Sequence, residues 1–354
     1  MEGPILIHCV TQKGKGYDPA ENADDKYHGV SKFNIITGAQ HKGKSNAPAY
    51  TKVFAECLIK EAQEDDKICA ITAAMPDSTG LLPFRDRFPD RCFDVGIAEQ
   101  HAVTAAAGMA MGGLRPVLAV YSTFLTRAMD QTNLDVGLHR LPVVCCIDRA
   151  GVTGDDGPSH HGLLDIVLLS KVPGMTIFAP SSYQELQQML GDALGITDGP
   201  SAIRWPKTAA PQVGWDEVGA GLTARRIIDA SKSADVCLIG AGKMLASATT
   251  AAGILETEGR RVTVWDPRVL RPIDPTMIED ARQHQLVVTI EDGFREGGFG
   301  SAVQDALSDT DPSCQVLVLG VPVGHHGHGP ADALLRSFGL DGAAVADAVR
   351  NRLC

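Results

Sequence analysis

Three stretches of the sequence place residue types suited to acid–base or binding chemistry directly after an apolar run. The first reads Asp94-Val95-Gly96-Ile97-Ala98-Glu99-Gln100-His101, in which a glycine turn leads from a strand end to a carboxylate that enters a helix. In open α/β sheets ligands bind at the carboxyl ends of strands, so Glu99 lies where a functional carboxylate is expected. An alternative is that Glu99 only stabilises the helix N-terminus, where the helix dipole favours an acid.

The second stretch, Tyr121-Ser122-Thr123-Phe124-Leu125-Thr126-Arg127, also follows an apolar strand. Phe124 could stack on a planar ring, and Arg127 could hold an anion. Taken by itself, the stretch favours the plainer interpretation, in which Phe124 packs in the core and Arg127 lies on the surface.

The third stretch runs from Asp148 to Gly162 and combines repeated glycines, paired acids and paired imidazoles. Glycines allow a backbone to approach a ligand closely, and His160 or His161 could transfer a proton. A solvated connection between two elements is the alternative.

Two further motifs give weaker evidence of a functional site. Gly297-Gly298-Phe299-Gly300 fits neither the Walker pattern nor the dinucleotide fingerprint, so a tight turn into a helix is the favoured interpretation. His325-His326-Gly327-His328 has no carboxylate or cysteine at a fixed spacing, and we expect a solvated loop there. We expect no metal ligands in the chain.

Composition excludes several classes of protein. The 354 residues include 43 acidic and 32 basic ones, for a formal charge of −11, and scattered basic residues do not favour a nucleic-acid partner. Nine cysteines at irregular positions are typical of reduced thiols rather than of a disulfide scaffold or a zinc site. The apolar run near the start is too short for a membrane span, and we expect a cytoplasmic protein without a membrane partner.

The elements that must position these residues alternate between helix and strand. A helical stripe covers residues 50–65, and continuous apolar strands are predicted at 68–72, 93–95, 116–120 and 142–147, with a small-residue helix at 98–111. A second set follows a loop at 208–221, with strands at 236–239, 262–265, 286–290 and 316–319 and helices at 244–258, 275–284 and 300–307. Apolar strands between amphipathic helices require a parallel sheet covered on both faces, so we predict two open α/β domains in tandem.

The start of the chain has a different character. Residues 5–10 are predicted to form a buried strand, and residues 11–43, rich in Lys, Gly, Asp and Asn, a long connecting loop. We expect the boundaries to be 1–46 for a tail and linker, 47–212 for the first α/β domain and 213–354 for the second.

Together the motifs resemble one family. Gly-Ile-Ala-Glu-Gln-His at 96–101, Tyr-Ser-Thr-Phe-Leu-x-Arg-Ala-x-Asp-Gln at 121–131, Asp-Gly-Pro-Ser-His at 156–160 and His-Gly-Val at 28–30 are similar to the 1-deoxy-D-xylulose-5-phosphate synthases, and the likeness runs through the whole chain. It implies a transketolase-like pyrimidine-binding domain followed by a transketolase C-terminal domain. It also implies that thiamine diphosphate condenses pyruvate with glyceraldehyde 3-phosphate with loss of CO2, a step toward isoprenoids and thiamine.

The resemblance assigns roles to individual residues. Glu99 would hydrogen-bond a nitrogen of the cofactor's pyrimidine ring, on which Phe124 would stack, with Ile97 as a further cofactor contact. His28 and His160 would act as proton-transfer or orienting groups at the reacting centre.

Other residues would serve the acceptor. Asp156 would position His160, and Tyr121, Arg127 and Arg149 would bind the triose and its phosphate. Lys207 stands where the family commonly has arginine, and it keeps the charge but loses the bidentate fork.

One motif of thiamine diphosphate enzymes is not found. They hold the diphosphate and its Mg2+ through Gly-Asp-Gly and a later Asn, whereas the nearest match here, Gly191-Asp192-Ala193, has no Asn after it until Asn351. We therefore expect the diphosphate-binding domain to be missing, and the chain to act as a homodimer or with a partner chain that carries this domain and the Mg2+ ligands. Alternatives are a beta-type subunit of a two-oxoacid dehydrogenase and a non-catalytic interaction module.

Overall fold

The computed structural model describes residues 3–23, 26–27, 32–40, 47–230 and 235–353, which belong to two compact units, residues 1–46 and 47–354. The first unit contains the short helix α1 (Asp18–Asn22) and three aromatic rings, Tyr17, Tyr27 and Phe33, with centroids 5.2–5.8 Å apart. Glu21 on α1 accepts hydrogen bonds from the Gly16 N–H at 2.9 Å and from Lys15 at 3.1 Å.

Two predictions for this unit are wrong. Residues 5–10 form no strand and are exposed, with 94% of Leu6 accessible, and the predicted loop at 11–43 contains α1. A strand is stable only when a neighbouring strand completes its backbone hydrogen bonds, and within the described part of this unit the one bridge lies elsewhere, between Phe33 and Gln40.

Seven strands form the first sheet of the second unit, in the order β10-β5-β6-β4-β3-β1-β2. All neighbouring pairs are parallel except β10 with β5. The strands are β1 (Ile68–Thr72), β2 (Cys92–Asp94), β3 (Arg115–Tyr121), β4 (Val144–Asp148), β5 (Thr176–Phe178), β6 (Ser201–Arg204) and β10 (Val269–Arg271). Every residue of β1, β4, β5 and β6 is buried, as the continuous apolar runs require.

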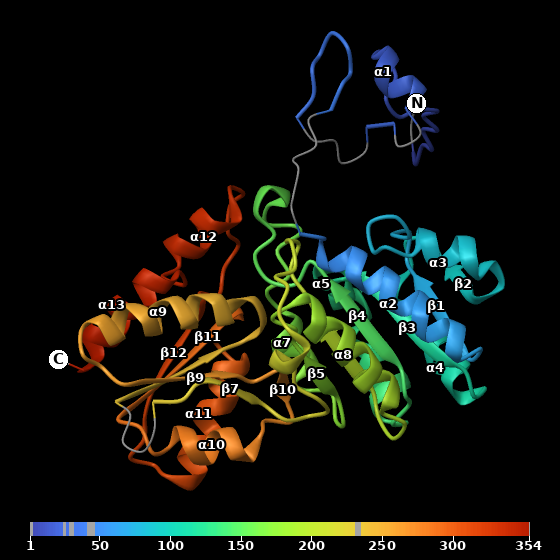
Figure 1. Ribbon diagram of the computed structural model, residues 1–354. Coiled ribbons are helices and arrows are strands. Elements are labelled where there is room, and N and C mark those ends of the chain that lie inside the picture. The colour runs from blue at the N-terminus through green and yellow to red at the C-terminus, as the bar shows by residue number, and fades with distance from the viewer. Residues whose placement is uncertain (1–2, 24–25, 28–31, 41–46, 231–234, 354) are drawn as a thin grey trace. The chain divides into compact units, whose positions relative to one another are not determined.

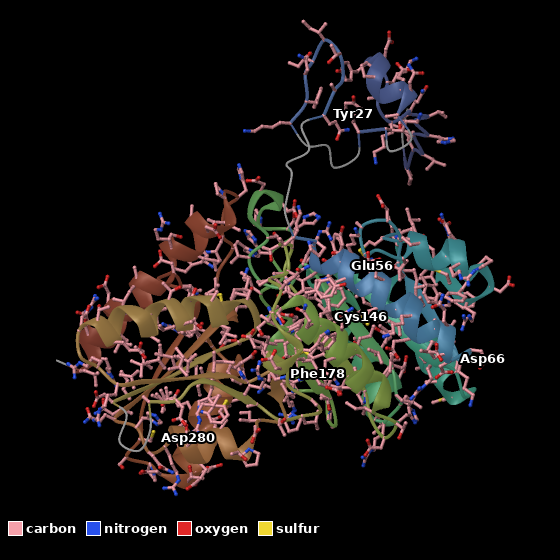
Figure 2. All side chains as sticks on the ribbon, in the orientation of Figure 1. Tyr27, Glu56, Asp66, Cys146, Phe178 and Asp280 are labelled. Atoms are coloured by element: carbon pink, nitrogen blue, oxygen red, sulfur yellow. The ribbon has the colours of Figure 1, made fainter. Side chains whose placement is uncertain are left out.

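One face of this sheet is covered by α2 (Tyr50–Glu64), α3 (Leu82–Arg87) and α8 (Tyr183–Gly195), and Figure 1 shows α2 and α8 side by side. Helix α8 begins where the Ser182 hydroxyl accepts a hydrogen bond from the Glu185 N–H at 3.1 Å. Cys146 and Phe178, labelled in Figure 2, are fully buried in this layer.

The opposite face packs on α4 (Glu99–Met111), on α7 (Asp165–Leu169) and on a run of short turns after β3. These turns are α5 (Ser122–Leu125), η2 (Thr126–Ala128), α6 (Met129–Gln131) and the π-helix η3 (Thr132–Gly137). The same apolar cluster includes Cys237, Trp265 and Phe299 from the second sheet and its helices, so one core is shared by both domains.

The second sheet has the order β12-β11-β8-β9-β7 and is parallel except for the β7–β9 pair. Its strands are β7 (Arg225–Ile228), β8 (Val236–Gly240), β9 (Val262–Asp266), β11 (Leu286–Phe294) and β12 (Gln315–Val321). Figure 1 shows α9 (Leu245–Thr257), α12 (Ala331–Ser337) and α13 (Gly342–Leu353) on one side, and α10 (Pro275–Ala281) and α11 (Phe299–Thr310) on the other.

The prediction of two open α/β domains in tandem is confirmed, with one feature that it did not include. Strand β10 comes from the second half of the chain but pairs antiparallel with β5 at the edge of the first sheet, with Val269 opposite Phe178. In the described part of the chain, no helix is long and apolar enough to cross a membrane.

Candidate active site

The topology of the first sheet brings the sequence motifs to one edge. Strands β2, β1, β3, β4 and β6 are parallel neighbours, so their carboxyl ends lie side by side. Strand β1 is flanked by β2 on one side and β3 on the other, which makes it the point where the strand order reverses. Crevices at such points are the usual binding sites of open α/β sheets.

Glu99 follows β2 as the first residue of α4 and is 3% exposed. The turn before it is fixed by Asp94, whose Oδ1 accepts hydrogen bonds from the N–H groups of Ala74 at 2.7 Å and Gly96 at 3.0 Å. Gly96 has φ 71°, a conformation that favours glycine. The local sequence thus folds so that a buried carboxylate faces the edge of the sheet.

The partner of Glu99 is Arg127, from the turns after β3. The Arg127 Nη1 lies 2.7 Å from the Glu99 Oε2, an ion pair in which this buried oxygen has no partner with hydrogen-bond geometry. The Arg127 side chain is 46% exposed, so the pair is open to solvent on one side. The Glu99 carboxylate is therefore buried and held by a partner that is itself about half exposed.

Aromatic rings lie beside this pair. Phe124 is half-buried and stacks on Tyr121 with ring centroids 5.6 Å apart and an interplanar angle of 14°. His160 meets the Phe124 ring edge-on at 5.5 Å, and its Nδ1 lies 2.9 Å from the Ser159 Oγ. Phe124 contacts the core and also takes part in this cluster, so the two interpretations of its role are compatible.

Charged residues that follow β4 and β6 in the chain extend this group of site side chains. The Arg149 guanidinium lies 3.9 Å from the centroid of the Tyr121 ring and donates to the Ser78 carbonyl at 3.0 Å. Burial raises the pKa of Tyr121. The Lys207 Nζ lies 2.7 Å from both oxygens of Asp156, and the Arg149 Nε lies 4.0 Å from the Asp156 Oδ2.

The structure thus brings most of the predicted site residues together, with some new pairings. Asp156 pairs with Lys207 and Arg149, whereas His160 contacts Ser159 and the rings of Tyr121 and Phe124. Ile97 is 76% exposed next to Glu99. His28, the remaining predicted residue, lies outside the described residues.

The sequence gives no role to Ser78, and for His161 it offers only proton transfer, as an alternative to His160. Ser78 follows β1, and only the strand order shows that the loop after β1 meets Tyr121 and Arg149. His161 was weighed only as a proton carrier, but it is 8% exposed and its ring contacts Thr153 and Gly327.

Beneath the site lies a buried ion cluster of Asp165, Arg204, Lys243 and Asp292. Arg204 contacts the Asp165 Oδ2 at 2.7 Å and the Asp292 Oδ1 at 2.9 Å, and Lys243 lies 3.0 Å from the Asp292 Oδ2. Burial opposes ionisation of Asp292, but Arg204 and Lys243 outweigh it and lower the pKa of that carboxyl. The cluster joins the carboxyl end of β6 to β11 and so fixes the two domains together.

Glu291, next to this cluster, is buried and accepts the N–H groups of Phe299 at 3.0 Å and Gly300 at 2.8 Å, at the start of α11. Burial raises the pKa of Glu291 to about 7. The glycine-rich motif at 297–300 therefore forms a turn into a helix, as predicted, with a carboxylate capping it.

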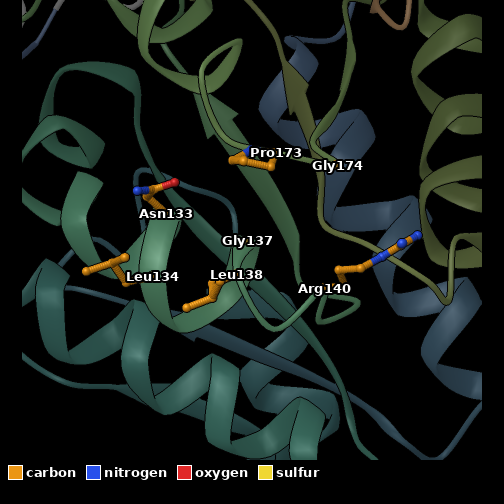
Figure 3. A pocket seen from close by; sticks show the side chains of 7 residues that line it. All are labelled: Asn133, Leu134, Gly137, Leu138, Arg140, Pro173 and Gly174. Atoms are coloured by element: carbon orange, nitrogen blue, oxygen red, sulfur yellow. The ribbon is translucent and has the colours of Figure 1, made fainter.

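A surface cavity of about 540 Å³ lies away from these residues (Figure 3). Its lining comes from η3 and the residues that lead into β4 and β5, including Leu134, Leu138, Arg140 and Pro173. It therefore opens at the amino ends of the strands, the edge opposite the predicted site, and includes none of the predicted site residues.

Two family models match most of the chain: "Transketolase, pyrimidine binding domain" over residues 46–212 and "Transketolase, C-terminal domain" over residues 227–345. A solved chain described as a split gene transketolase, inactive beta4 tetramer, is 30% identical with a TM-score of 0.77, over 86% of this chain and 98% of that one. These matches define the class, and the chain belongs to the transketolase family.

Within that family, the resemblance to 1-deoxy-D-xylulose-5-phosphate synthases is confirmed. The synthase of Gloeobacter violaceus is 45% identical over 361 residues, covering 100% of this chain and 56% of the relative. That of Mycobacteroides abscessus is 46% identical over 351 residues, covering 97% and 54%. The chain spans about half the length of the curated relatives it matches.

The residues present fit one end of thiamine diphosphate. The buried carboxyl of Glu99 and the half-buried Phe124 ring suit a pyrimidine, which offers a flat apolar face and a ring nitrogen that can hydrogen-bond a carboxyl group when one of the two carries a proton. In the described part of the chain, no group of three or more His, Cys, Asp or Glu side chains is placed to hold a metal ion.

Proposed function

We propose that this chain is the pyrimidine-side portion of a 1-deoxy-D-xylulose-5-phosphate synthase, acting on pyruvate and glyceraldehyde 3-phosphate. The observation that carries the proposal is the buried carboxylate of Glu99, ion-paired with the half-exposed Arg127, beside Phe124 at the reversal point of the sheet. The identity of 42–46% to four synthases over nearly the whole chain supports it.

Thiamine diphosphate, when bound, supplies the carbon nucleophile and electron sink that decarboxylation of a 2-oxo acid requires. Glu99 would hydrogen-bond a ring nitrogen of the pyrimidine, accepting when that nitrogen carries a proton, and Phe124 would stack on the ring, with Ile97 as a further contact. Because Arg127 pairs with Glu99, it must turn outward to reach an acceptor substrate.

The acceptor side of the site consists of Tyr121, Arg149 and Lys207. Arg149 and Lys207 hold the triose phosphate, and Asp156, which pairs with Lys207, is displaced or shared when the phosphate arrives. His160, beside the aromatic rings, moves a proton to or from the acceptor carbonyl oxygen, together with His28.

We propose further that the chain needs a second component. The relative described as a split gene transketolase, inactive beta4 tetramer, has a chain of similar extent, which supports the expectation that this portion alone is inactive. A homodimer with a shared site, or a partner chain with the diphosphate-binding domain and Mg2+ ligands, would complete it. Free thiols at the described cysteines are compatible with a cytoplasmic location.

The test is a complementation assay. The purified chain is mixed with a fragment of the Gloeobacter violaceus synthase that covers the part this chain does not match, with thiamine diphosphate and Mg2+. We expect deoxyxylulose phosphate from the mixture, none from the chain alone, and at least about 10²-fold less from a Glu99→Gln mixture. If the relative's own matching half restores activity but this chain does not, the proposed function is wrong. Micromolar cofactor binding or turnover by the chain alone would refute the need for a second component.

A further inference from the structure

The loop that carries Asp156 and His160 is closed at its base and packed between the two domains. Gly151 and Gly162 exchange backbone hydrogen bonds of 2.7 and 2.8 Å, which join the ends of the loop. A Cβ on Gly151 would lie 1.8 Å from the Asp292 Oδ2, and one on Gly162 would lie 2.4 Å from the Arg149 carbonyl oxygen. The base of the loop therefore has no room for side chains.

The rest of the loop meets a segment of the second domain, residues 322–330, which connects β12 to α12. The Gly329 N–H donates to the Gly154 carbonyl at 3.4 Å. A Cβ on Gly154 would lie 3.1 Å from the Gly329 carbonyl oxygen, and one on Gly157 would lie 3.3 Å from the Cβ of His328. The two backbones thus pack against each other directly.

His161 is the side chain that joins them. Its Nδ1 accepts the Thr153 N–H at 3.1 Å, with the Thr153 hydroxyl also 3.1 Å away, and its Nε2 lies 3.0 Å from the Gly327 carbonyl oxygen. A backbone N–H can only donate and a carbonyl can only accept, so both contacts are satisfied by one form of the ring, neutral with the proton on Nε2. Both nitrogens are engaged and the ring is buried, so His161 is not free to exchange a proton with a substrate.

We propose that His161 is a positioning residue, through which the second domain holds the loop that presents Asp156 and His160 to the substrate. The catalytic part of this inference rests on the proposed function. On its other side, the loop is held by contacts within the first domain, where Thr123 donates to the Ser159 carbonyl at 3.0 Å and Lys207 binds Asp156. Within the described residues, His161 is the side chain of this loop that hydrogen-bonds to the second domain.

The first experiment uses the chain as it exists. In the 15N-labelled protein, long-range proton–nitrogen correlation should show the His161 ring with one protonated nitrogen, Nε2, and one acceptor, Nδ1. Hydrogen–deuterium exchange then compares His161→Leu, which keeps bulk but no polar atom, with His161→Gln, which keeps one acceptor and one donor. The exposed His325→Leu is the matched control.

We expect His161→Leu to speed exchange about tenfold at residues 153–160 and at 325–329, as the loss of buried hydrogen bonds predicts. His161→Gln should restore most of the protection, and His325→Leu should leave residues 153–160 unchanged. Unchanged exchange at 325–329 in His161→Leu would overturn the inference, because the two segments would then not be coupled through this ring. A doubly protonated ring, or the opposite tautomer, would also overturn it.

The second experiment uses the complemented enzyme. His161→Leu should lower kcat about tenfold while the KM for glyceraldehyde 3-phosphate changes less than about threefold, because the phosphate contacts lie on other elements. His161→Gln should recover kcat. An unchanged kcat in His161→Leu would refute the positioning role. If the wild-type mixture is inactive while exchange is coupled as expected, the proposed function fails and the link between the domains through His161 stands.

Discussion

Two cations at the end of β6 illustrate how environment separates function from stability. Lys207 and Arg204 stand three residues apart, and each pairs with carboxylates at 2.7–2.9 Å. The Lys207 side chain is 42% exposed and its partner Asp156 25%, whereas Arg204 is 4% exposed and its partners Asp165 and Asp292 0% and 2%. Ion pairs of similar length are therefore solvent-exposed at Lys207 and buried at Arg204.

This difference in burial indicates which of the two cations can exchange its carboxylate partner for another anion. An exposed ion pair contributes little net stability because water competes for both charges, so Lys207 can exchange a carboxylate for a phosphate at low cost. A buried pair cannot be separated without leaving a charge in a nonpolar environment, so Arg204 stays with its partners and holds two domains together. We therefore expect the solvent-exposed ion pair of Lys207 to affect activity and the buried ion pairs of Arg204 to affect the stability of the fold.

The largest expected effect is on activity, at Glu99, which is buried but whose partner Arg127 is 46% exposed. Glu99→Gln should reduce turnover of the complemented enzyme by about 10²- to 10⁴-fold, because an amide cannot replace the carboxylate in proton movement on the pyrimidine. Urea unfolding should show the fold intact. Proton exchange at the thiazolium carbon of the bound cofactor, followed by NMR, reports the step directly. Exchange as fast as in the wild type would show that Glu99 is misassigned.

The contribution of the buried ion pairs is tested by Arg204→Met, with Lys207→Met as the matched control from the same end of β6. Removing Arg204 leaves Asp165 and Asp292 without their shared cation, and we expect a loss of about 3–5 kcal/mol in the free energy of unfolding. Removing Lys207 should cost less than about 1 kcal/mol. Equal losses in urea unfolding would erase the distinction between the two pairs.

A third prediction concerns Arg149, which is half-buried but points at the site. Arg149→Ala should weaken binding of glyceraldehyde 3-phosphate by about 1.5–3 kcal/mol, the contribution of one charge-assisted contact, and spare pyruvate. Steady-state kinetics with both substrates varied measures this. Arg140→Ala, at the opposite edge of the sheet, is the control and should change neither KM. An unchanged KM for the triose phosphate in Arg149→Ala would contradict the assignment.

The last prediction concerns how the free energy of unfolding changes with pH. Burial raises the pKa of Glu291 from its usual 4.5 to about 7, so between these values the folded chain binds more protons than the unfolded chain. This group therefore lowers stability as pH rises from about 4.5 to 7. Glu291→Gln should flatten that part of the curve in urea unfolding at several pH values, and an identical slope would place the titration elsewhere.

The sequence predicts strands such as β1 and β4 because a strand buried within a parallel sheet consists of a continuous run of apolar residues. It does not predict β5, β6, β7 and β10, which have only three or four residues each. Residues 5–10 show the opposite error, since an apolar run without a neighbouring strand stays exposed.

The same limit applies to the site. Glu99, Phe124, Asp156 and His160 stand in recognisable motifs after strands, and their clustering follows from a parallel sheet. The pairing of Arg204 with Asp292 spans 88 residues, and that of His161 with Gly327 spans 166. No local pattern encodes such contacts, because they depend on how the second domain docks on the first.

Strand β10 bears on what can be separated in this molecule. It covers the edge of β5, whose backbone groups would otherwise be available to pair with another chain. A protease that cuts the exposed connection near residue 214 would leave the fragments held together by this strand and by the shared core. Replacing the second domain by recombination at that point would also remove β10 and expose the edge of β5. The two domains therefore form one structural unit.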